Sequence, residues 1–206
     1  MKLYLVRHAE SISNKNGVVS DDNSPLSEEG IAQAEKLGKR LSALEISVIY
    51  TSPLTRAKQT AGIISSHLKD LKIIETKKVI EKKEASSIIG KSRKELPWDL
   101  IKKMRVDPDW RYEDGESFND VRNRIIEFLA EIEKYPEETN ILIVTHTSFI
   151  KHLTAYVVLG EKFFVPEIYY CFSDRLETIN GSVTILERKQ KYYETKSSWY
   201  LVSWMS

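Results

Sequence analysis

Short apolar runs alternate with amphipathic helical segments along this chain, and no other pattern in the sequence limits its fold as strongly. Ile141 to Val144 is an unbroken run of Ile, Leu and Val, which is typical of a strand buried on both faces of a parallel sheet. The runs 3–6 and 46–50 have the same character, and an edge-type strand is expected between about 73 and 80. Strands that alternate with helices predict an α/β fold, a three-layer α/β/α sandwich around a mostly parallel sheet.

The helical segments repeat apolar side chains at intervals of three and four residues. The first begins after Ser27, a predicted N-cap. Its inward face should consist of Ile31, Ala34, Leu37, Gly38 and Leu41. The second runs from about Pro53, which suits a first helical turn, to about His67. Further helices are expected from Ser117 to about Tyr135 and from about Ser148 to Leu159.

The C-terminal part departs from this alternation. Three short apolar stretches, at about 169–172, 182–187 and 200–204, predict a β-meander. Asn180-Gly181 stands between the first two, and this dipeptide is typical of a hairpin turn.

The segment from Glu81 to Glu116 is polar and carries prolines and large aromatic residues. We expect a single domain over residues 1–206, with a partly helical, cap-like lobe inserted at about 81–116. The many Lys and Arg residues of this lobe form either a solvated basic face or a second anion site. Trp98, Trp110 and Tyr112 either pack in a core, which is the commoner use, or line a pocket.

Composition excludes several classes of function. The 206 residues include 31 Lys and Arg and 30 Asp and Glu, so the formal net charge of +1 argues against a nucleic-acid binder. Cys171 is the only cysteine, which excludes a disulfide framework and suggests a small core side chain. No run approaches the roughly 20 apolar residues of a membrane span, and the N-terminal run is too short for a signal peptide. A cytoplasmic protein without membrane contact is therefore expected.

Residues able to bind and attack a phosphoryl group follow the predicted strands. Arg7 and His8 follow the first strand, His146 follows the 141–144 run, and Arg56 lies in the first turn after the second strand. Because ligands bind at the carboxyl ends of such strands, we expect these side chains to converge. A neutral imidazole is a nitrogen nucleophile near pH 7, and arginines donate paired hydrogen bonds to phosphate oxygens.

The motifs around these residues resemble the histidine phosphatase, or phosphoglycerate mutase-like, superfamily. The resemblance begins with Leu5-Val6-Arg7-His8-Ala9-Glu10-Ser11 and Asn14 and continues, in family order, through 25–34, 50–61, 114–117 and 144–146. It covers most of the chain. Ala9 and Thr147 stand where many members have Gly after each histidine, but neither difference removes a charged group.

The resemblance implies a metal-independent phosphatase without a cofactor. His8 would attack phosphorus and become a phosphohistidine. Arg7, Arg56 and His146 would hold the phosphoryl oxygens and neutralise charge in the transition state.

The resemblance also implies supporting residues. Asn14 and Ser13 would assist in binding the phosphoryl group, and Thr147 would border the same pocket. A carboxylate would protonate the leaving oxygen and later activate water. Glu81 matches its place after the third strand, and Glu84 is the nearest alternative.

The leading hypothesis is a hydrolase of small-molecule phosphate monoesters. Phosphoglycerate mutase is usually longer, with segments that exclude water, so this shorter chain favours water as the acceptor. A mutase and a non-catalytic phospho-ligand binding protein remain alternatives; the latter would require the loss of a charged catalytic residue, and none is evidently lost. We expect no nucleic-acid or membrane partner, and either a monomer or a homodimer.

Overall fold

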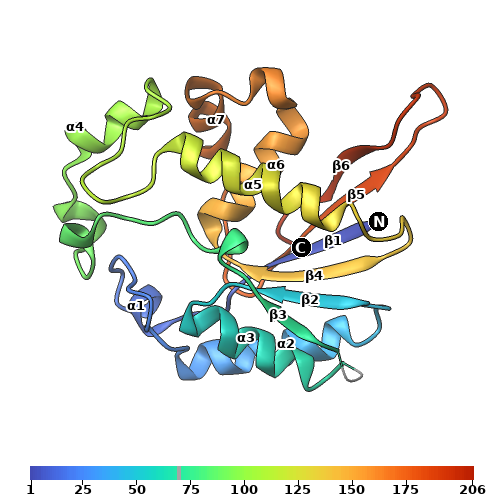
Figure 1. Cartoon of the computed structure of the whole chain (residues 1–206). Coiled ribbons are helices and arrows are strands. Elements are labelled where there is room, and N and C mark those ends of the chain that lie inside the picture. The colour runs from blue at the N-terminus through green and yellow to red at the C-terminus, as the bar shows by residue number, and fades with distance from the viewer. Residues whose placement is uncertain (69–70) are drawn as a thin grey trace.

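The computed structural model describes residues 1–68 and 71–206, which form a mixed sheet flanked by helices (Figure 1). The strands of this sheet are β1 (Lys2–Arg7), β2 (Val48–Thr51), β3 (Ile73–Glu75), β4 (Asn140–Thr145), β5 (Val183–Lys189) and β6 (Ser198–Ser203). Their order is β3-β2-β4-β1-β5-β6. The first four in this order are parallel, while β5 is antiparallel to β1 and β6 is antiparallel to β5. The predicted mostly parallel sheet is confirmed.

The register of the central strands aligns their carboxyl ends. Arg7 of β1 pairs with Thr145 of β4, and Thr51 of β2 pairs with Val144. The pairing continues one residue past β1, because the His8 amide donates to the carbonyl of Thr145 at 2.9 Å. The residues that follow these three strands therefore lie together at one edge of the sheet.

Helices cover both faces of the sheet, as the sequence predicts. In Figure 1, α2 (Glu28–Leu41) and α3 (Thr55–Ser65) lie below it, and α5 (Phe118–Ile132) and α6 (Thr147–Leu159) lie above it. Alternate side chains of β1 supply the two cores. Leu3 and Leu5 pack with α5 and α6, whereas Tyr4 and Val6 pack with α2 and α3.

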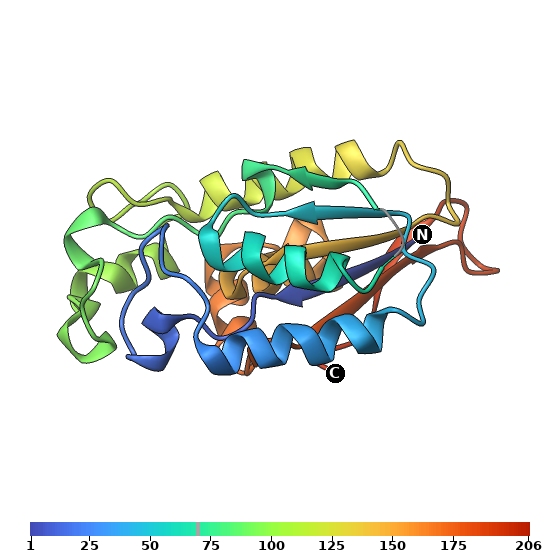
Figure 2. The ribbon, with the colours of Figure 1, turned by 90° about the horizontal axis from the view of Figure 1, so that it is seen from below.

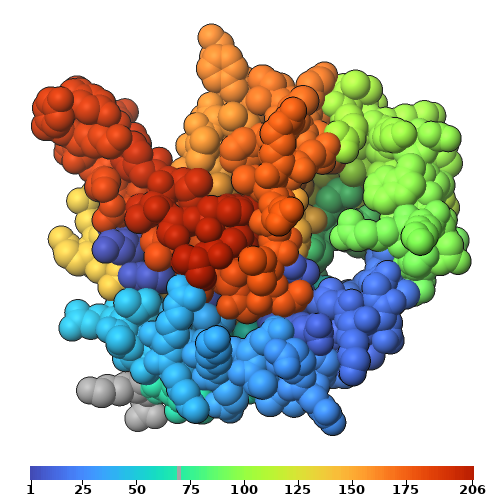
Figure 3. Space-filling model, turned by 180° about the vertical axis from the view of Figure 1, so that it is seen from behind, coloured from blue at the N-terminus to red at the C-terminus, as the bar shows by residue number. Residues whose placement is uncertain are grey.

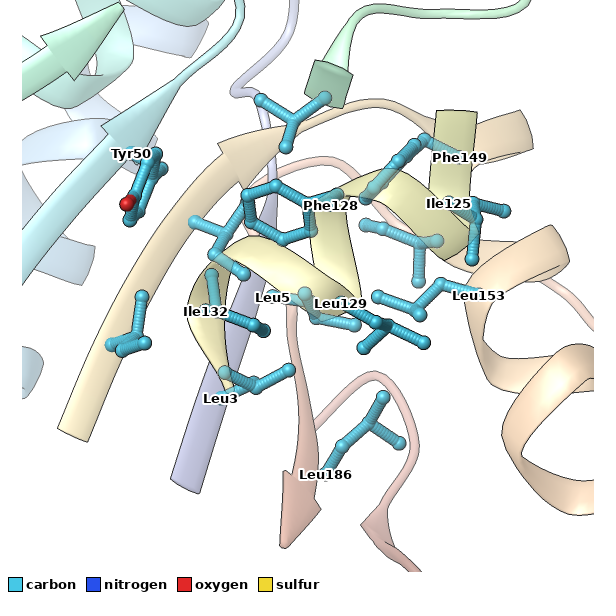
Figure 4. Close-up of a cluster of buried hydrophobic side chains, with 14 of the residues drawn as sticks. Leu3, Leu5, Tyr50, Ile125, Phe128, Leu129, Ile132, Phe149, Leu153 and Leu186 are labelled. Carbon is cyan, nitrogen blue, oxygen red and sulfur yellow. The ribbon is translucent and has the colours of Figure 1, made fainter. Parts of the chain in front are cut away.

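The larger core lies between the sheet and α5 (Figure 4). The inward face predicted for this helix is confirmed, since Val121, Ile125, Phe128, Leu129 and Ile132 are all buried. Ser117 caps the helix: its hydroxyl accepts from the Asp120 amide at 3.1 Å. The Asp120 carboxylate accepts in return from the Ser117 amide, which completes a capping box.

The start of α2 is pressed against the loop that follows β1. The predicted N-cap is confirmed, because Ser27 Oγ accepts from the Gly30 amide at 3.0 Å. A Cβ atom at position 30 would lie 2.0 Å from the carbonyl oxygen of Glu10, so only glycine permits this approach. The contact holds the loop after His8 in place.

The segment 81–116 lies at the carboxyl edge of the sheet, at the same end as α1 (Ile12–Lys15), as Figure 2 shows. It contains α4 (Trp98–Ile101) and short 3₁₀ turns at Ser86–Ile88, Arg93–Glu95 and Lys102–Arg105. Val18 forms an antiparallel bridge with Ser92, which joins this segment to the loop after α1. Trp98 is 42% exposed, so the core role expected for it is wrong.

Residues 169–172 form part of a helix, α7 (Pro166–Ser173), and the predicted strand there is wrong. Pro166 occupies the first turn, and Tyr169 and Ser173 recur at helical spacing on the buried face. Cys171 faces the other way and is exposed, so the core role expected for it is also wrong. Asn180-Gly181 forms a turn, but it joins α7 to β5 and is not a hairpin.

Smaller differences concern the limits of elements. Pro53 precedes α3, which begins at Thr55 with Leu54 as its N-cap. The third strand ends at Glu75, and a 3₁₀ turn over Lys77–Val79 replaces its expected continuation. Ile31 is 48% exposed, because it lies at the margin of the buried stripe of α2.

Among the described residues, no helix is long and apolar enough to cross a membrane.

Candidate active site

The two predicted histidines lie side by side at the carboxyl edge of the sheet. The ring centroids of His8 and His146 are 5.0 Å apart. Arg56, in the first turn of α3, donates from Nε to His8 Nε2 at 3.2 Å. Arg56 and His146 lie 48 and 138 positions from His8 in the chain, and the parallel pairing of the strands brings the three residues together.

His8 is buried in a single tautomer. Its Nδ1 lies 2.8 Å from the carbonyl oxygen of Ala9, which can only accept, so Nδ1 carries the proton. Nε2 therefore keeps its lone pair and accepts from Arg56. Burial, followed by the positive charge of Arg56, lowers the pKa of His8 well below its usual value. At neutral pH the ring presents an unprotonated nitrogen.

His146 is fully buried, and only one of its ring nitrogens has a partner. Nε2 lies 2.7 Å from the hydroxyl of Ser52, the residue after β2. Nδ1 is buried and has no hydrogen-bond partner among the described residues. Burial also lowers the pKa of His146 well below its usual value, so this ring is neutral at pH 7 as well.

Arg56 is buried and Arg7 is half-buried, and within the described residues no carboxylate pairs directly with either positive charge. Arg7 donates from Nη1 to the carbonyl oxygen of Thr178 at 3.0 Å, and Arg56 donates from Nη1 to that of Asp21 at 2.8 Å. In residues 1–68 and 71–206 neither forms an ion pair, and Arg7 Nε has no hydrogen-bond partner. Burial lowers the pKa of both guanidiniums below its usual value, yet an arginine stays charged at physiological pH. An uncompensated positive pair of this kind favours binding of an anion.

Glu81 is the carboxylate next to this positive pair. Its Oε1 accepts from the Ser148 amide at 3.0 Å, in the first turn of α6, and from the Lys82 amide at 2.9 Å. Burial raises the pKa of Glu81, although the two amides and the charge of Arg56 oppose that rise. Glu84 instead lies 4.0 Å from the ammonium of Lys82 and is 40% exposed. Of the two alternatives, the half-buried Glu81 is the one whose charge acts on both Arg7 and Arg56.

The predicted supporting residues Asn14, Thr147 and Ser13 differ in how their side chains contact the site. Asn14 Oδ1 accepts from the side chain of Asn180 at 3.2 Å, and Asn180 also donates to the carbonyl of His8 at 2.9 Å. Thr147 lies 3.4 Å from the Thr178 hydroxyl. Ser13 instead donates to Ser24 at 2.8 Å, and no contact links its side chain to the histidines within the described chain.

Ser52, Thr178 and Asn180 contact the site and were missed in the sequence. Ser52 directly follows a predicted strand, so the strand-end argument that selected His8 and His146 could have found it. Thr178 and Asn180 lie between α7 and β5, in a stretch that the sequence assigned to a meander. No local signal marks them.

The space-filling view shows an opening at this end of the molecule, between the blue N-terminal segment and the green 81–116 segment (Figure 3). The amide of Val19 donates to the carbonyl of Lys91 at 2.9 Å, so the two segments touch beside this opening. Within the part of the chain that the structure describes, no three His, Cys, Asp or Glu side chains are grouped to hold a metal ion.

Two imidazoles and two guanidiniums meet at the carboxyl edge of a mostly parallel α/β sandwich, an arrangement suited to binding a phosphoryl group. A sequence model of the histidine phosphatase superfamily (branch 1) matches residues 3–198, and the chain belongs to this family. It is an enzyme of the phosphatase type found there.

Known relatives agree with this assignment. Phosphoserine phosphatase 1 of Hydrogenobacter thermophilus is 32% identical over 154 residues, which cover 71% of each protein. The 5''-phosphoribostamycin phosphatase of Niallia circulans is 36% identical over 161 residues, covering 73% of this chain and 75% of that protein. The structure of a mycobacterial glucosyl-3-phosphoglycerate phosphatase with VO3 shares the fold, with a TM-score of 0.80 at 22% identity. That comparison covers 100% of this chain and 98% of the mycobacterial one.

Proposed function

We propose that the chain hydrolyses phosphate monoesters through a phosphohistidine formed on His8. The observation that carries this proposal is the tautomer of His8. Its Nδ1 proton is held by the carbonyl of Ala9, so the lone pair lies on Nε2. This lone pair accepts from Arg56 Nε in the structure and would attack phosphorus once Arg56 donates to the phosphoryl oxygens instead. The lowered pKa of the ring keeps that lone pair unprotonated at neutral pH.

The phosphoryl group would lie among Arg7, Arg56 and His146. Each guanidinium is permanently charged and is not paired with a carboxylate within the described residues, so a dianion there would neutralise the cluster. The two buried polar atoms without partners, Arg7 Nε and His146 Nδ1, belong to the same cluster. Donors that are already in position stabilise the transition state without reorganisation. Asn14, Thr147 and, more remotely, Ser13 would border this site.

Glu81 would act as the general acid and then as the general base. In the first step the N–P bond to His8 Nε2 forms, the P–O bond to the leaving group breaks, and Glu81 gives its proton to the leaving oxygen. In the second step the Glu81 carboxylate takes a proton from water, the water oxygen attacks phosphorus, and the N–P bond breaks. Burial supports this role, because a raised pKa keeps the carboxyl protonated at a higher pH.

The substrate would be a small phosphate ester that reaches the site beside the 81–116 segment. We propose that this segment is a cap-like lobe inserted in a single domain over 1–206 and that it contacts the leaving group. By their names, two relatives act on phosphoserine and on 5''-phosphoribostamycin. The shared chemistry is the phosphate monoester. A monomer and a homodimer remain equally compatible with this site, and sedimentation would distinguish them.

The test is the replacement His8→Ala, assayed with an aryl phosphate. Loss of a nucleophile should reduce kcat by about 10³-fold or more while the circular dichroism spectrum is unchanged. Acid-labile, base-stable phosphate should be trapped on the unmodified enzyme and not on the variant. Full retained activity of His8→Ala would contradict the proposal. Exchange between 2- and 3-phosphoglycerate without release of phosphate would support a mutase instead.

A further inference from the structure

Ser52 has no role in the mechanism proposed above, yet it forms a hydrogen bond with His146. Ser52 is completely buried, and its Oγ lies 2.7 Å from His146 Nε2. We infer that Ser52 is a positioning residue: it holds His146 as the tautomer protonated on Nδ1, so that this ring donates a hydrogen bond to the phosphoryl group. The inference rests on the proposed function.

The hydrogen-bonding capacity of the serine hydroxyl determines the tautomer. The Leu54 amide donates to Ser52 Oγ at 3.3 Å, so one acceptor position of the oxygen is used. The hydroxyl proton needs an acceptor, and among the described residues only His146 Nε2 lies within reach. If Nε2 carried a proton instead, the buried hydroxyl proton of Ser52 would have no partner, which is unfavourable. Nε2 therefore accepts, and the proton of the neutral ring lies on Nδ1.

Nδ1 is the nitrogen left for a ligand. It is buried and has no protein partner in the described chain, and its ring lies beside that of His8. An N–H group at this position attracts a phosphoryl oxygen, whereas the lone pair of the other tautomer would repel it. By selecting the tautomer, Ser52 thus determines whether His146 Nδ1 attracts or repels a phosphoryl oxygen.

The same tautomer has opposite consequences in the two histidines. In His8 the proton on Nδ1 is bound by the Ala9 carbonyl, and the lone pair lies on Nε2, where it accepts from Arg56, an arginine of the proposed phosphate site. In His146 the lone pair of Nε2 is bound by Ser52, and the Nδ1 proton remains available. One ring can therefore attack phosphorus while its neighbour binds an oxygen of the same group.

Strand pairing explains why the serine is correctly placed. Ser52 follows β2 by one residue and His146 follows β4 by one residue, and these strands are neighbours in the sheet. The Ser52 amide donates to the carbonyl of Val144 at 3.0 Å, which extends the ladder to the serine itself. The distance between hydroxyl and imidazole is thus set by backbone hydrogen bonds.

The direct test is a long-range ¹H–¹⁵N spectrum of the histidine side chains in the unmodified protein at pH 7. We expect His146 to be protonated on Nδ1. A ring protonated on Nε2 would overturn the inference, and this measurement needs no variant and no turnover. It is therefore independent of the proposed hydrolysis, which the His8→Ala assay tests.

The second test compares Ser52→Ala with Ser52→Thr. Ser52→Ala should populate the Nε2-protonated tautomer of His146 and weaken orthovanadate binding about tenfold. It should lower kcat/KM by about 10–100-fold, the range seen when a metal-binding histidine loses its supporting hydrogen bond. Ser52→Thr retains the hydroxyl and should restore the tautomer. Thr154→Val removes a buried hydroxyl on α6, away from Ser52; it is the matched control and should change neither property. Unchanged tautomer and vanadate affinity in Ser52→Ala would refute the role.

Discussion

Burial acts on the individual residues of this site in ways that depend on their charge. The same loss of water that lowers the pKa of His8 and His146 raises that of Glu81, because in each case the charged form is disfavoured. Two bases are thereby kept unprotonated at neutral pH, while the neighbouring acid stays protonated to a higher pH than an exposed glutamate does. These are the protonation states that the first step of the proposed mechanism requires.

The role of Glu81 predicts a dependence on the leaving group. Glu81→Gln should lower kcat by about 10²–10⁴-fold for an alkyl phosphate, because an alkoxide must be protonated as it leaves. The loss should be smaller for an aryl phosphate, whose phenolate leaves more easily. Steady-state kinetics with both substrates measure the difference. Glu84→Gln is the control, and a larger effect there would transfer the assignment to Glu84.

The shifts also predict the pH profile of kcat/KM for an alkyl phosphate. Activity requires neutral His8, whose pKa lies well below 6.5, so activity should fall only when the pH drops well below that value. It also requires protonated Glu81, whose pKa lies above 4.5, so activity should fall again as the pH rises through that raised pKa. The result is a bell whose acidic limb reports His8 and whose alkaline limb reports Glu81. The alkaline limb should vanish in Glu81→Gln, and its persistence would contradict the assignment.

At the scale of single elements, helix α2 separates what the apolar pattern predicts well from what it predicts poorly. Leu37 lies in the middle of the buried stripe and is 3% exposed, whereas Ile31 lies at its margin and is 48% exposed. Both side chains fit the helical repeat. Their positions relative to the sheet, which the repeat does not contain, decide their burial.

This difference predicts unequal costs of truncation in α2. Leu37→Ala should lower the free energy of unfolding by about 2–5 kcal/mol, because it removes buried methyl groups and leaves a cavity. Ile31→Ala should change it by less than about 0.5 kcal/mol, as is usual for an exposed position. Urea denaturation of both variants gives the comparison. Equal losses would mean that Ile31 is buried in solution.

At the scale of the whole molecule, Arg124 of α5 joins three parts that meet beside the site. It forms an ion pair with Glu116, at the end of the 81–116 segment, with Nη2 and Oε2 2.9 Å apart. Its Nη1 also donates to the carbonyls of Lys78 and Ile80, at 3.2 and 2.9 Å. Glu81 is the next residue in the chain after Ile80. A guanidinium is suited to this position because it can donate in several directions at once.

Replacement of this arginine should therefore affect stability and activity together. Arg124→Lys keeps the charge but cannot make all these hydrogen bonds, and we expect a loss of about 2–3 kcal/mol in the free energy of unfolding. Activity should fall as well, since the chain beside Glu81 loses its support. Arg122→Lys, on the same helix, changes an ion pair with the largely exposed Glu161 and should cost less than about 1 kcal/mol. Similar effects of the two substitutions would argue against this role of Arg124.

Much of the molecule could be predicted from local patterns. The central strands, α5 and the caps at Ser27 and Ser117 follow from periodicity and capping, which are properties of neighbouring residues. The convergence of His8, His146 and Arg56 followed from one rule about the ends of parallel strands. The helix at 166–173 was missed because a short apolar stretch fits a strand and a helix equally well.

The sequence by itself determined which residue types follow the strands, and hence the two histidines and two arginines of the candidate site, while the family resemblance pointed to Glu81 as the candidate acid. Only the tertiary structure decided the protonation of these groups and the partners Ser52, Thr178 and Asn180. The physical reason is range: periodicity and capping act between residues a few positions apart, whereas burial and hydrogen bonding at the site join segments far apart in the chain. Those contacts exist only once the sheet has formed.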